Sequence, residues 1–308
     1  MKNIFYIFLS YFLLNSCQFN NYETVEKNEF FRNGVSTGKF TNLENGYTYY
    51  ETKNDDKKNT LVFIHGFSVP SYIWDKTYYS AANKDFKVVR LDLFGRGFSD
   101  NPNIDYTDEL FANQVIQLLE KINVNKATFL GLSNGGRVIS KIAYLKPSLV
   151  EKLVYVSSNS FMEHKSITEN SVTGKEINDF IRNRYPTISN GQLLDFKYPE
   201  NHKNWVIKYE DLLKYKGFAR ALVSTMKNHK NLDKENSFID NSEIPYFLVW
   251  GDSDSTVVYK EFEKKLNKIM LRKKEYFIED SGHLPNIENS IEFEDLLFNK
   301  ILIDNFNK

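Results

Sequence analysis

The chain has 308 residues, a length that suits one large α/β domain or two small ones. Lys plus Arg and Asp plus Glu both number 40, so the net charge is zero and nothing favours nucleic acid or an acidic partner. A single cysteine, Cys17, excludes an internal disulfide and a cysteine-rich zinc site. The five histidines lack metal-ligand spacing on a shared helix face, so we expect no metal and no cofactor. A metal site built from ligands scattered along the sequence stays open as the alternative.

The N-terminus has the layout of a bacterial export signal. Lys2 gives a positive start, and residues 4–14 form an apolar run that is too short for a comfortable transmembrane helix. Residues 14–17 (LNSC) resemble the lipobox of bacterial lipoproteins, in which a small residue precedes the lipidated cysteine. The resemblance implies a signal peptide over residues 1–16, lipidation of Cys17, a polar tether over residues 17–38, and a lipid-anchored protein of the bacterial cell envelope. The alternative is an ordinary secretory signal and a secreted or periplasmic protein.

Apolar runs alternate with amphipathic stretches from residue 40 onward. This alternation favours βαβ units and a mostly parallel central sheet with helices on both faces. Buried strands are expected at residues 61–64, 88–91, 127–130, 153–156, 245–250 and 275–278, with an early antiparallel strand at residues 47–51.

Three helices of the body can be expected from their ends and their apolar stripes. Thr107 can cap the first, with Asp108 and Glu109 in its first turn. The apolar stripe of that helix is Phe111, Val115, Leu118, Leu119 and Ile122. The second is expected at residues 133–145, before Pro147, and the last at residues 291–305.

Residues 159–241 break the alternation. They contain helix-like pieces at residues 174–184 and 203–216 but no run that resembles a buried strand, and the segment is too long for a plain connection. We interpret it as an inserted helical cap over the sheet. Residues 39–158 and 242–308 would then form the α/β core.

Residues 130–136 (LGLSNGG) contain the pattern G-x-S-x-G around Ser133. The pattern follows an expected strand and opens an expected helix, as a strand–elbow–helix turn requires. Side chains in place of Gly131 and Gly135 would collide with the neighbouring strand and helix. Ser133 would project above the carboxyl ends of the strands, near a helix N-terminus that favours a developing anion. The pattern therefore predicts a nucleophilic serine, with a passive serine in a Gly-rich turn as the alternative.

An acidic loop and a histidine follow the last two expected strands. Residues 250–254 (WGDSD) follow one of them and residues 281–283 (SGH) follow the other. An imidazole titrates near neutrality and can take the proton of a serine hydroxyl, while a buried carboxylate holds the ring in the right tautomer. The chain order serine, aspartate, histidine is that of α/β-hydrolases.

These segments, with residues 65–67 (HGF) and 92–99 (DLFGRGFS), resemble the α/β-hydrolase family over about residues 45–300. The resemblance implies the α/β-hydrolase fold, with Ser133 as nucleophile, His283 as general base and Asp254 as the acid. It further implies an oxyanion hole made by the N–H groups of Phe67 and Asn134.

The resemblance assigns supporting parts to two other segments. His65 is expected to support the oxyanion loop rather than to act as the base. Residues 92–99 are expected to form a structural turn, because a lone Gly-x-Gly has no phosphate-binding context here.

Asp252 is the rival of Asp254 in the acidic loop. The family pattern places the acid three residues after Gly251, at Asp254. The residue directly after Gly251 is still leaving the strand, whereas the third can point back, and Asp252 is better placed to cap the turn. Asp280 is an unfavourable candidate because it shares the short loop of His283.

The implied activity is hydrolysis of carboxylic esters through an acyl-enzyme, as in esterases and monoacylglycerol lipases. Ser133 disfavours the branches with an aspartate nucleophile, such as haloalkane dehalogenases and epoxide hydrolases. Carbon–carbon bond hydrolases with the same triad stay open, and so does a silent scaffold that only binds. We expect a small-molecule ester with an apolar acyl part, because the cap aromatics could line an apolar pocket above Ser133, although no individual substrate-binding residue can be named. Those aromatics are Phe161, Phe180, Tyr185, Trp205, Tyr209 and Phe218.

Overall fold

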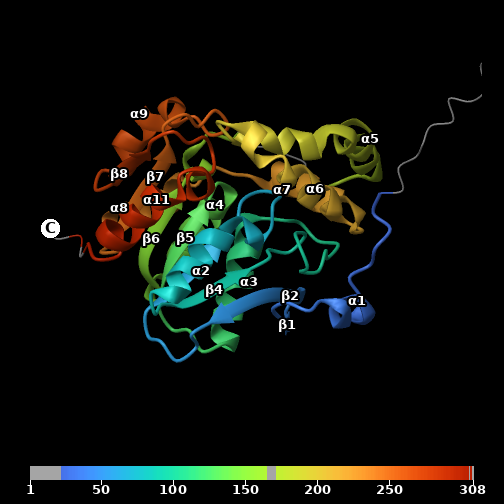
Figure 1. The fold of residues 1–308 in the computed structure, drawn as a ribbon, viewed down its shortest axis with the longest axis horizontal. Helices are drawn as coiled ribbons and strands as arrows, with labels where there is room; N and C mark the ends of the chain where they lie inside the picture. The colour runs from blue at the N-terminus through green and yellow to red at the C-terminus, as the bar shows by residue number, and fades with distance from the viewer. Residues whose placement is uncertain (1–21, 165–170, 305, 307–308) are drawn as a thin grey trace, which may run out of the picture.

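The computed structural model describes residues 22–164, 171–304 and 306 (Figure 1). At its centre is an eight-stranded sheet in the order β1-β2-β4-β3-β5-β6-β7-β8. The strands are β1 (Lys39–Leu43), β2 (Gly46–Lys53), β3 (Thr60–Ile64), β4 (Lys87–Leu91), β5 (Ala127–Leu132), β6 (Val150–Val156), β7 (Tyr246–Gly251) and β8 (Lys274–Ile278). The β1–β2 and β2–β4 pairs are antiparallel and all other pairs are parallel, which confirms the mostly parallel sheet.

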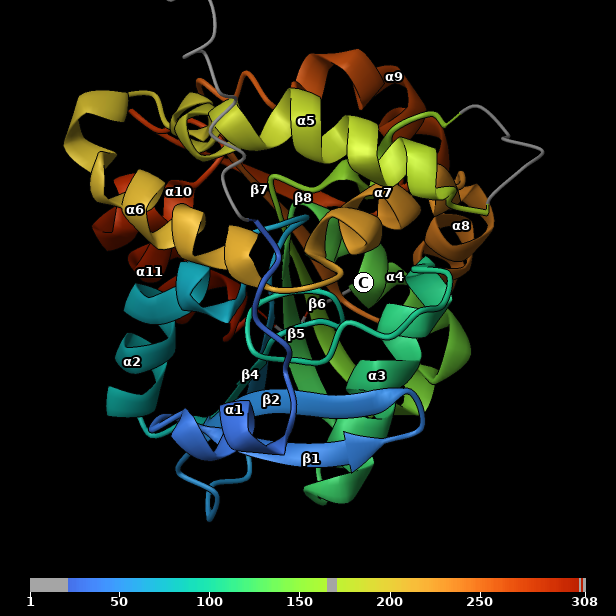
Figure 2. The same ribbon diagram turned by 90° about the vertical axis from the view of Figure 1, so that its right-hand side faces the viewer.

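Helices cover both faces of the sheet. Figure 2 shows α2 and α11 against one face, α3 and α4 against the other, and α5, α6 and α7 across one end. The α-helices are α1 (Glu29–Gly34), α2 (Asp75–Asn83), α3 (Asp108–Lys121), α4 (Asn134–Leu145), α5 (Gly174–Gly191), α6 (Asn204–Glu210), α7 (Phe218–Asn228), α8 (Asp233–Asn241), α9 (Tyr259–Ile269), α10 (Pro285–Glu288) and α11 (Ser290–Leu296). Each face of the sheet carries its own apolar core.

The apolar runs of the sequence became the central strands. Every residue of β3, β4, β5 and β7 is buried, as parallel strands covered on both faces must be. Strand β1 was not expected, because its sequence KFTNL is partly exposed and has no continuous apolar run. It pairs only with β2 and forms the antiparallel edge of the sheet.

Two expected helices show how well helix ends can be predicted. Helix α3 begins after Thr107, whose side chain accepts a hydrogen bond from the Leu110 N–H, as its sequence predicted. The final helix is shorter than expected, because α11 gives way to a π-helical turn over Leu297–Ile301. The carbonyls of Ile301 and Leu302 accept hydrogen bonds from Lys152 Nζ at 3.0 and 2.7 Å, so that side chain ties down the end of the helix.

The segment expected as a cap is helical in its described residues. Helix α5 contacts both α6 and α7 above the ends of the strands (Figure 2). Helix α8 differs, because it packs against α4 of the core, and Ser140 of α4 donates a hydrogen bond to Asn236 at 2.9 Å. The cap therefore has fewer helices above the sheet than its expected range of residues 159–241 suggests.

The described part of the expected tether contacts both cap and core. The carboxylate of Glu23 accepts hydrogen bonds from the N–H groups of Gly217 and Ala219 in the cap. Lys27 Nζ donates to the Ser99 carbonyl at 2.6 Å and to the Asn101 side chain at 2.8 Å. Residues 1–21, which include the expected signal peptide and Cys17, lie outside the described residues. Within the described ones, no helix is long and apolar enough to cross a membrane.

Candidate active site

Ser133 lies at a sharp turn between β5 and α4. Its backbone is at φ 51° and ψ −116°, a left-handed conformation that is strained for any residue except glycine. Its N–H donates to the Val156 carbonyl of β6 at 2.8 Å, so the turn is anchored to the neighbouring strand. Strain held in place by the surrounding structure is typical of a residue whose side chain is presented for chemistry.

The glycines of the elbow are required by space. A Cβ atom on Gly131 would lie 2.5 Å from the Gly135 carbonyl oxygen, and one on Gly135 would lie 2.4 Å from the Ile64 carbonyl oxygen of β3. Both distances are well inside van der Waals contact. The collisions predicted for these two positions are therefore present, and α4 can approach β3 closely only because residue 135 has no side chain.

The structure brings Asp254 and His283 together. Asp254 Oδ2 accepts a hydrogen bond from His283 Nδ1 at 2.9 Å. Asp254 Oδ1 accepts from the N–H groups of Thr256 and Val257, each at 2.9 Å, so the carboxylate is fixed from both sides. With Nδ1 carrying the proton, the Nε2 atom of a neutral imidazole is free to accept one.

The environment of the His283 imidazole sets its affinity for a proton. Burial opposes the charged form, but the Asp254 carboxylate outweighs this effect with help from Asp195, so the pKa of His283 is raised above its usual range. A base with a raised pKa has a greater drive to remove a proton from a hydroxyl.

The rival carboxylates lie elsewhere. The side chain of Asp252 is 40% exposed, against 1% for Asp254, and Asp252 accepts a hydrogen bond from the neighbouring Ser253 hydroxyl. Asp280 forms an exposed ion pair with Lys197 at 2.9 Å. Neither carboxylate contacts His283.

The N–H groups expected to form an oxyanion hole are both free. Neither the N–H of Phe67 nor that of Asn134 donates a hydrogen bond to any other described residue. Asn134 is the first residue of α4, whose N-terminal N–H groups have no partner inside the helix. Phe67 lines the same cavity as Ser133 and His283. Two unpaired donors at such a site can bind an oxygen that becomes negatively charged.

His65 lies beside this loop as a buried supporting group. Its Nε2 accepts a hydrogen bond from the Leu93 N–H at 2.9 Å, and its Nδ1 lies 2.9 Å from the Gly66 carbonyl. Burial lowers the pKa of His65 to about 3, so the ring is neutral and joins two loops. Asp92 begins the turn over residues 92–99 and accepts hydrogen bonds from the N–H groups of Ser71 and Phe98, as a structural turn requires.

Two residues that the sequence did not single out connect the cap to the oxyanion loop and the elbow. Arg96 is buried and donates to the Phe67 carbonyl at 2.7 Å and to the Thr225 hydroxyl of α7 at 2.8 Å. His229, directly after α7, lies with Nε2 2.7 Å from Asn134 Oδ1, and its ring contacts that of Phe67. Burial and the nearby Arg137 lower the pKa of His229 to about 2, so it acts as a neutral donor. Arg96 lies within residues 92–99, which the sequence analysis treated only as a structural turn, and His229 is a cap histidine without a motif.

Ser133 and His283 line one cavity of about 210 Å³. Its core side is largely apolar and its cap side is polar, with Gln192 and Asp195 of the short 3₁₀ helix η4 (Gln192–Asp195).

None of the six cap aromatics lines this cavity, so the expectation that they form its apolar wall was wrong. Phe161, for example, packs against Tyr155 and Trp250 in the apolar core, as large apolar side chains commonly do. The residues lining the cavity are Gly66, Phe67, Ser68, Val69, Ile73, Leu132, Ser133, Gln192, Asp195, Thr256, His283 and Leu284.

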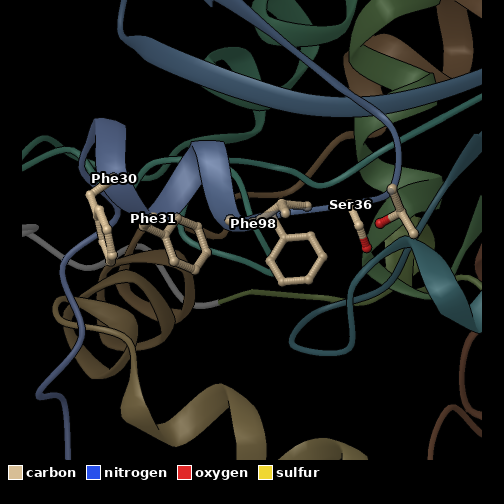
Figure 3. Close-up of a pocket in the computed structure, with 7 residues that line it drawn as sticks. Phe30, Phe31, Ser36 and Phe98 are labelled. Atoms are coloured by element: carbon tan, nitrogen blue, oxygen red, sulfur yellow. The ribbon is translucent and has the colours of Figure 1, made fainter.

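A second, larger hollow of about 540 Å³ lies beside α1. Figure 3 shows Phe31 and Phe98 side by side, with Phe30 further out along the helix and Ser36 at the other end. Its walls carry no histidine and no carboxylate, so they offer neither a base nor an acid. Within the described residues, no group of three or more His, Cys, Asp or Glu side chains could hold a metal ion.

Known proteins resemble this chain in sequence and in fold. A hydrolase of Bacillus subtilis is 25% identical over 251 residues, which cover 77% of this chain and 87% of that protein. The pimeloyl-(acyl-carrier protein) methyl ester esterase of Wigglesworthia glossinidia brevipalpis is 27% identical over 256 residues, covering 80% and 94% of the two chains. The crystal structure of a bromoperoxidase from Bacillus anthracis superposes with a TM-score of 0.73 at 18% identity, over 87% of this chain and all of the other.

These proteins carry different activities on one architecture, so the likeness in fold does not by itself select a reaction. Residues 59–290 match the family described as alpha/beta hydrolase fold, and this range contains the elbow, the acidic loop and His283. The chain therefore belongs to the alpha/beta hydrolase fold family.

Proposed function

We propose that this protein is a serine hydrolase that cleaves small carboxylic esters. The observation that carries the proposal is the 2.9 Å hydrogen bond between Asp254 and His283 beside a strained Ser133 that lines the same cavity as the imidazole. The esterase named among its relatives supports the same reaction class.

The steps follow from the roles of these groups. Ser133 Oγ attacks the ester carbonyl carbon while His283 Nε2 takes its proton, and the carbonyl oxygen becomes an anion bound by the N–H groups of Phe67 and Asn134. The tetrahedral intermediate collapses to an acyl-enzyme, and the leaving alcohol takes the proton from His283. A water molecule then repeats the sequence, which releases the carboxylic acid and restores the serine.

The size of the cavity favours a short acyl group. At about 210 Å³ it is smaller than the roughly 300–1,000 Å³ of pockets that hold drug-sized ligands. The apolar part of the substrate would lie against the core side of the cavity, where Val69, Ile73 and Leu132 are found.

A series of p-nitrophenyl esters of increasing acyl length tests this proposal. We expect kcat/KM to be highest for the acetate or butyrate and to fall at least about tenfold by the decanoate, because excess methylenes have no room. A steady rise toward the decanoate would contradict the short-acyl assignment. Absence of turnover on every ester, with turnover of a vinylogous diketone, would instead favour the carbon–carbon bond hydrolases.

We also propose that Cys17 carries a lipid anchor in a bacterial cell envelope. The support is the sequence LNSC at the end of a short apolar run, because a cysteine at that place is the acceptor in lipoproteins. Wild-type protein should fractionate with membranes and Cys17→Ser should not. Ser10→Ala, a change within the same apolar run, is the matched control and should behave like wild type. A Cys17→Ser protein that is processed and fractionates like wild type would refute the anchor.

A further inference from the structure

Asp195 places a carboxylate in the same cavity as Ser133 and His283. It is the last residue of η4 (Gln192–Asp195), in the cap, and its backbone carbonyl accepts a hydrogen bond from the His283 N–H at 2.8 Å. Asp195 and His283 are the titratable residues of the cavity wall. A cap residue is thus held against the loop that carries the base.

The carboxylate of Asp195 is only half satisfied by the protein. Oδ1 accepts a hydrogen bond from the Thr256 hydroxyl at 2.9 Å. No described residue donates a hydrogen bond to the other oxygen, and no described Lys, Arg or His forms an ion pair with Asp195. The nearby Lys197 is paired instead with Asp280 at 2.9 Å.

Asp195 is half-buried, and a carboxylate that is partly removed from water without an ion pair is less favourable than one in solvent. Burial raises the pKa of Asp195 above its usual value, with an opposing effect from His283. Asp254 lies close enough to add a charge of the same sign, and no lysine or arginine lines the cavity. Asp195 is therefore the one acidic side chain of the cavity wall, half-buried and without an ion pair among the described residues, and a positive group that enters the cavity can pair with it.

We propose that the cavity selects esters that carry a positive charge, with the cationic group of the substrate bound at Asp195. This inference rests on the proposed ester hydrolysis and names its substrate class. The reacting carbonyl would lie at Ser133 and the N–H groups of Phe67 and Asn134, and an ammonium group a few bonds away would pair with the free carboxylate oxygen. Esters that carry a carboxylate would be poor substrates, because two like charges would meet in a small space.

Matched ester pairs test the proposal on either side of the scissile bond. β-Alanine methyl ester and methyl butanoate differ by an ammonium in place of a methyl group on the acyl side. Acetylcholine and 3,3-dimethylbutyl acetate differ by a charged nitrogen in place of carbon on the alcohol side. The measured quantity is the ratio of kcat/KM for the cationic ester to that for its neutral partner.

Asp195→Asn is the informative variant because an asparagine oxygen can still accept from Thr256. We expect it to lower the cationic-to-neutral ratio about tenfold in one of the two pairs, as loss of a charge-assisted contact does. Because the ratio divides kcat/KM for the cationic ester by kcat/KM for the neutral ester, any general effect of the substitution on His283 cancels. Asp280→Asn, which removes a charge from the exposed neighbouring loop, is the control and should leave the ratio within about twofold of wild type.

The outcomes separate this inference from the proposed function. Equal losses on both members of each pair would mean that Asp195 only supports the His283 loop, and would overturn the inference. An unchanged ratio in both pairs would overturn it as well. If neither wild type nor any variant hydrolyses any of the four esters, the ester hydrolase assignment itself fails, and this outcome is distinct from a changed or unchanged ratio.

Discussion

The core wall of the cavity and its cap wall are built by different kinds of sequence. The core wall (Gly66, Phe67, Leu132, Ser133, His283, Leu284) stands on the ends of parallel strands, where short turns carry the chemistry. The cap wall (Gln192, Asp195) belongs to a short 3₁₀ helix in a helical insertion without such turns. If the two proposals hold, the reaction and its selectivity are supplied by separate parts of this chain, and variants of each wall test them separately.

The largest effect should come from the core wall. Ser133→Ala should lower ester turnover by at least about 10⁴-fold while leaving the fold intact, because the proposed acyl-enzyme forms on the Ser133 hydroxyl. The measurement is kcat/KM on p-nitrophenyl acetate, with circular dichroism to check folding. Activity within about tenfold of wild type would remove Ser133 from the role of nucleophile.

The two aspartates of the acidic loop should differ sharply. Asp254→Asn should lower kcat by about 10³ to 10⁴, as loss of a tautomer-fixing carboxylate does. Asp252→Asn, in an exposed position two residues earlier, should cost less than about threefold. A reversed order of these effects would transfer the role to Asp252 and leave the other assignments standing.

A smaller effect should come from the contact between cap and elbow. His229→Leu removes the donor to the Asn134 side chain, so we expect kcat to fall about tenfold with KM within about twofold, because only the transition state uses the neighbouring N–H. His229→Gln keeps a donor and should recover most of the loss. If both variants lower kcat equally, the hydrogen bond has no positioning role.

The smallest expected change is a shift in pH dependence. His283 must be neutral to act as a base, and Asp254 and Asp195 raise its pKa above the usual 6.5, so activity should be lost as the pH falls through a value higher than 6.5. Asp195→Asn removes one of the raising charges and should move this acid limb to lower pH. The assignment would be contradicted if wild-type activity fell to half at a pH below 6.5. It would also be contradicted if that half-activity pH rose in the Asp195→Asn variant.

The core wall could be anticipated because its geometry is local. A strand followed by G-x-S-x-G predicts where Ser133 lies, and the collision at Gly135 follows from the same turn. The choice of Asp254 over Asp252 came from the family pattern, which places the acid three residues after Gly251, together with the direction of a short loop. These features depend on a few neighbouring residues and on strand order, which the sequence pattern carries.

The cap wall could not be anticipated because it depends on distant contacts. Asp195 meets His283 across 88 residues of sequence, and Arg96 meets Thr225 across 129. Aromatic residues in the cap suggested an apolar pocket, but their size and apolar character are equally suited to packing, and packing is what the structure shows. An isolated aspartate between Leu194 and Phe196 was the only signal for Asp195.

The most direct test of the central claim is covalent labelling of the intact protein with a fluorophosphonate, followed by peptide mapping. A serine activated by His283 and Asp254 should take up one adduct, located on Ser133, and Asp254→Asn should slow the labelling by orders of magnitude. Ser133→Ala should take up none. An adduct on another residue, or no adduct on a folded wild-type protein, would contradict the assignment of Ser133, His283 and Asp254 as a catalytic triad.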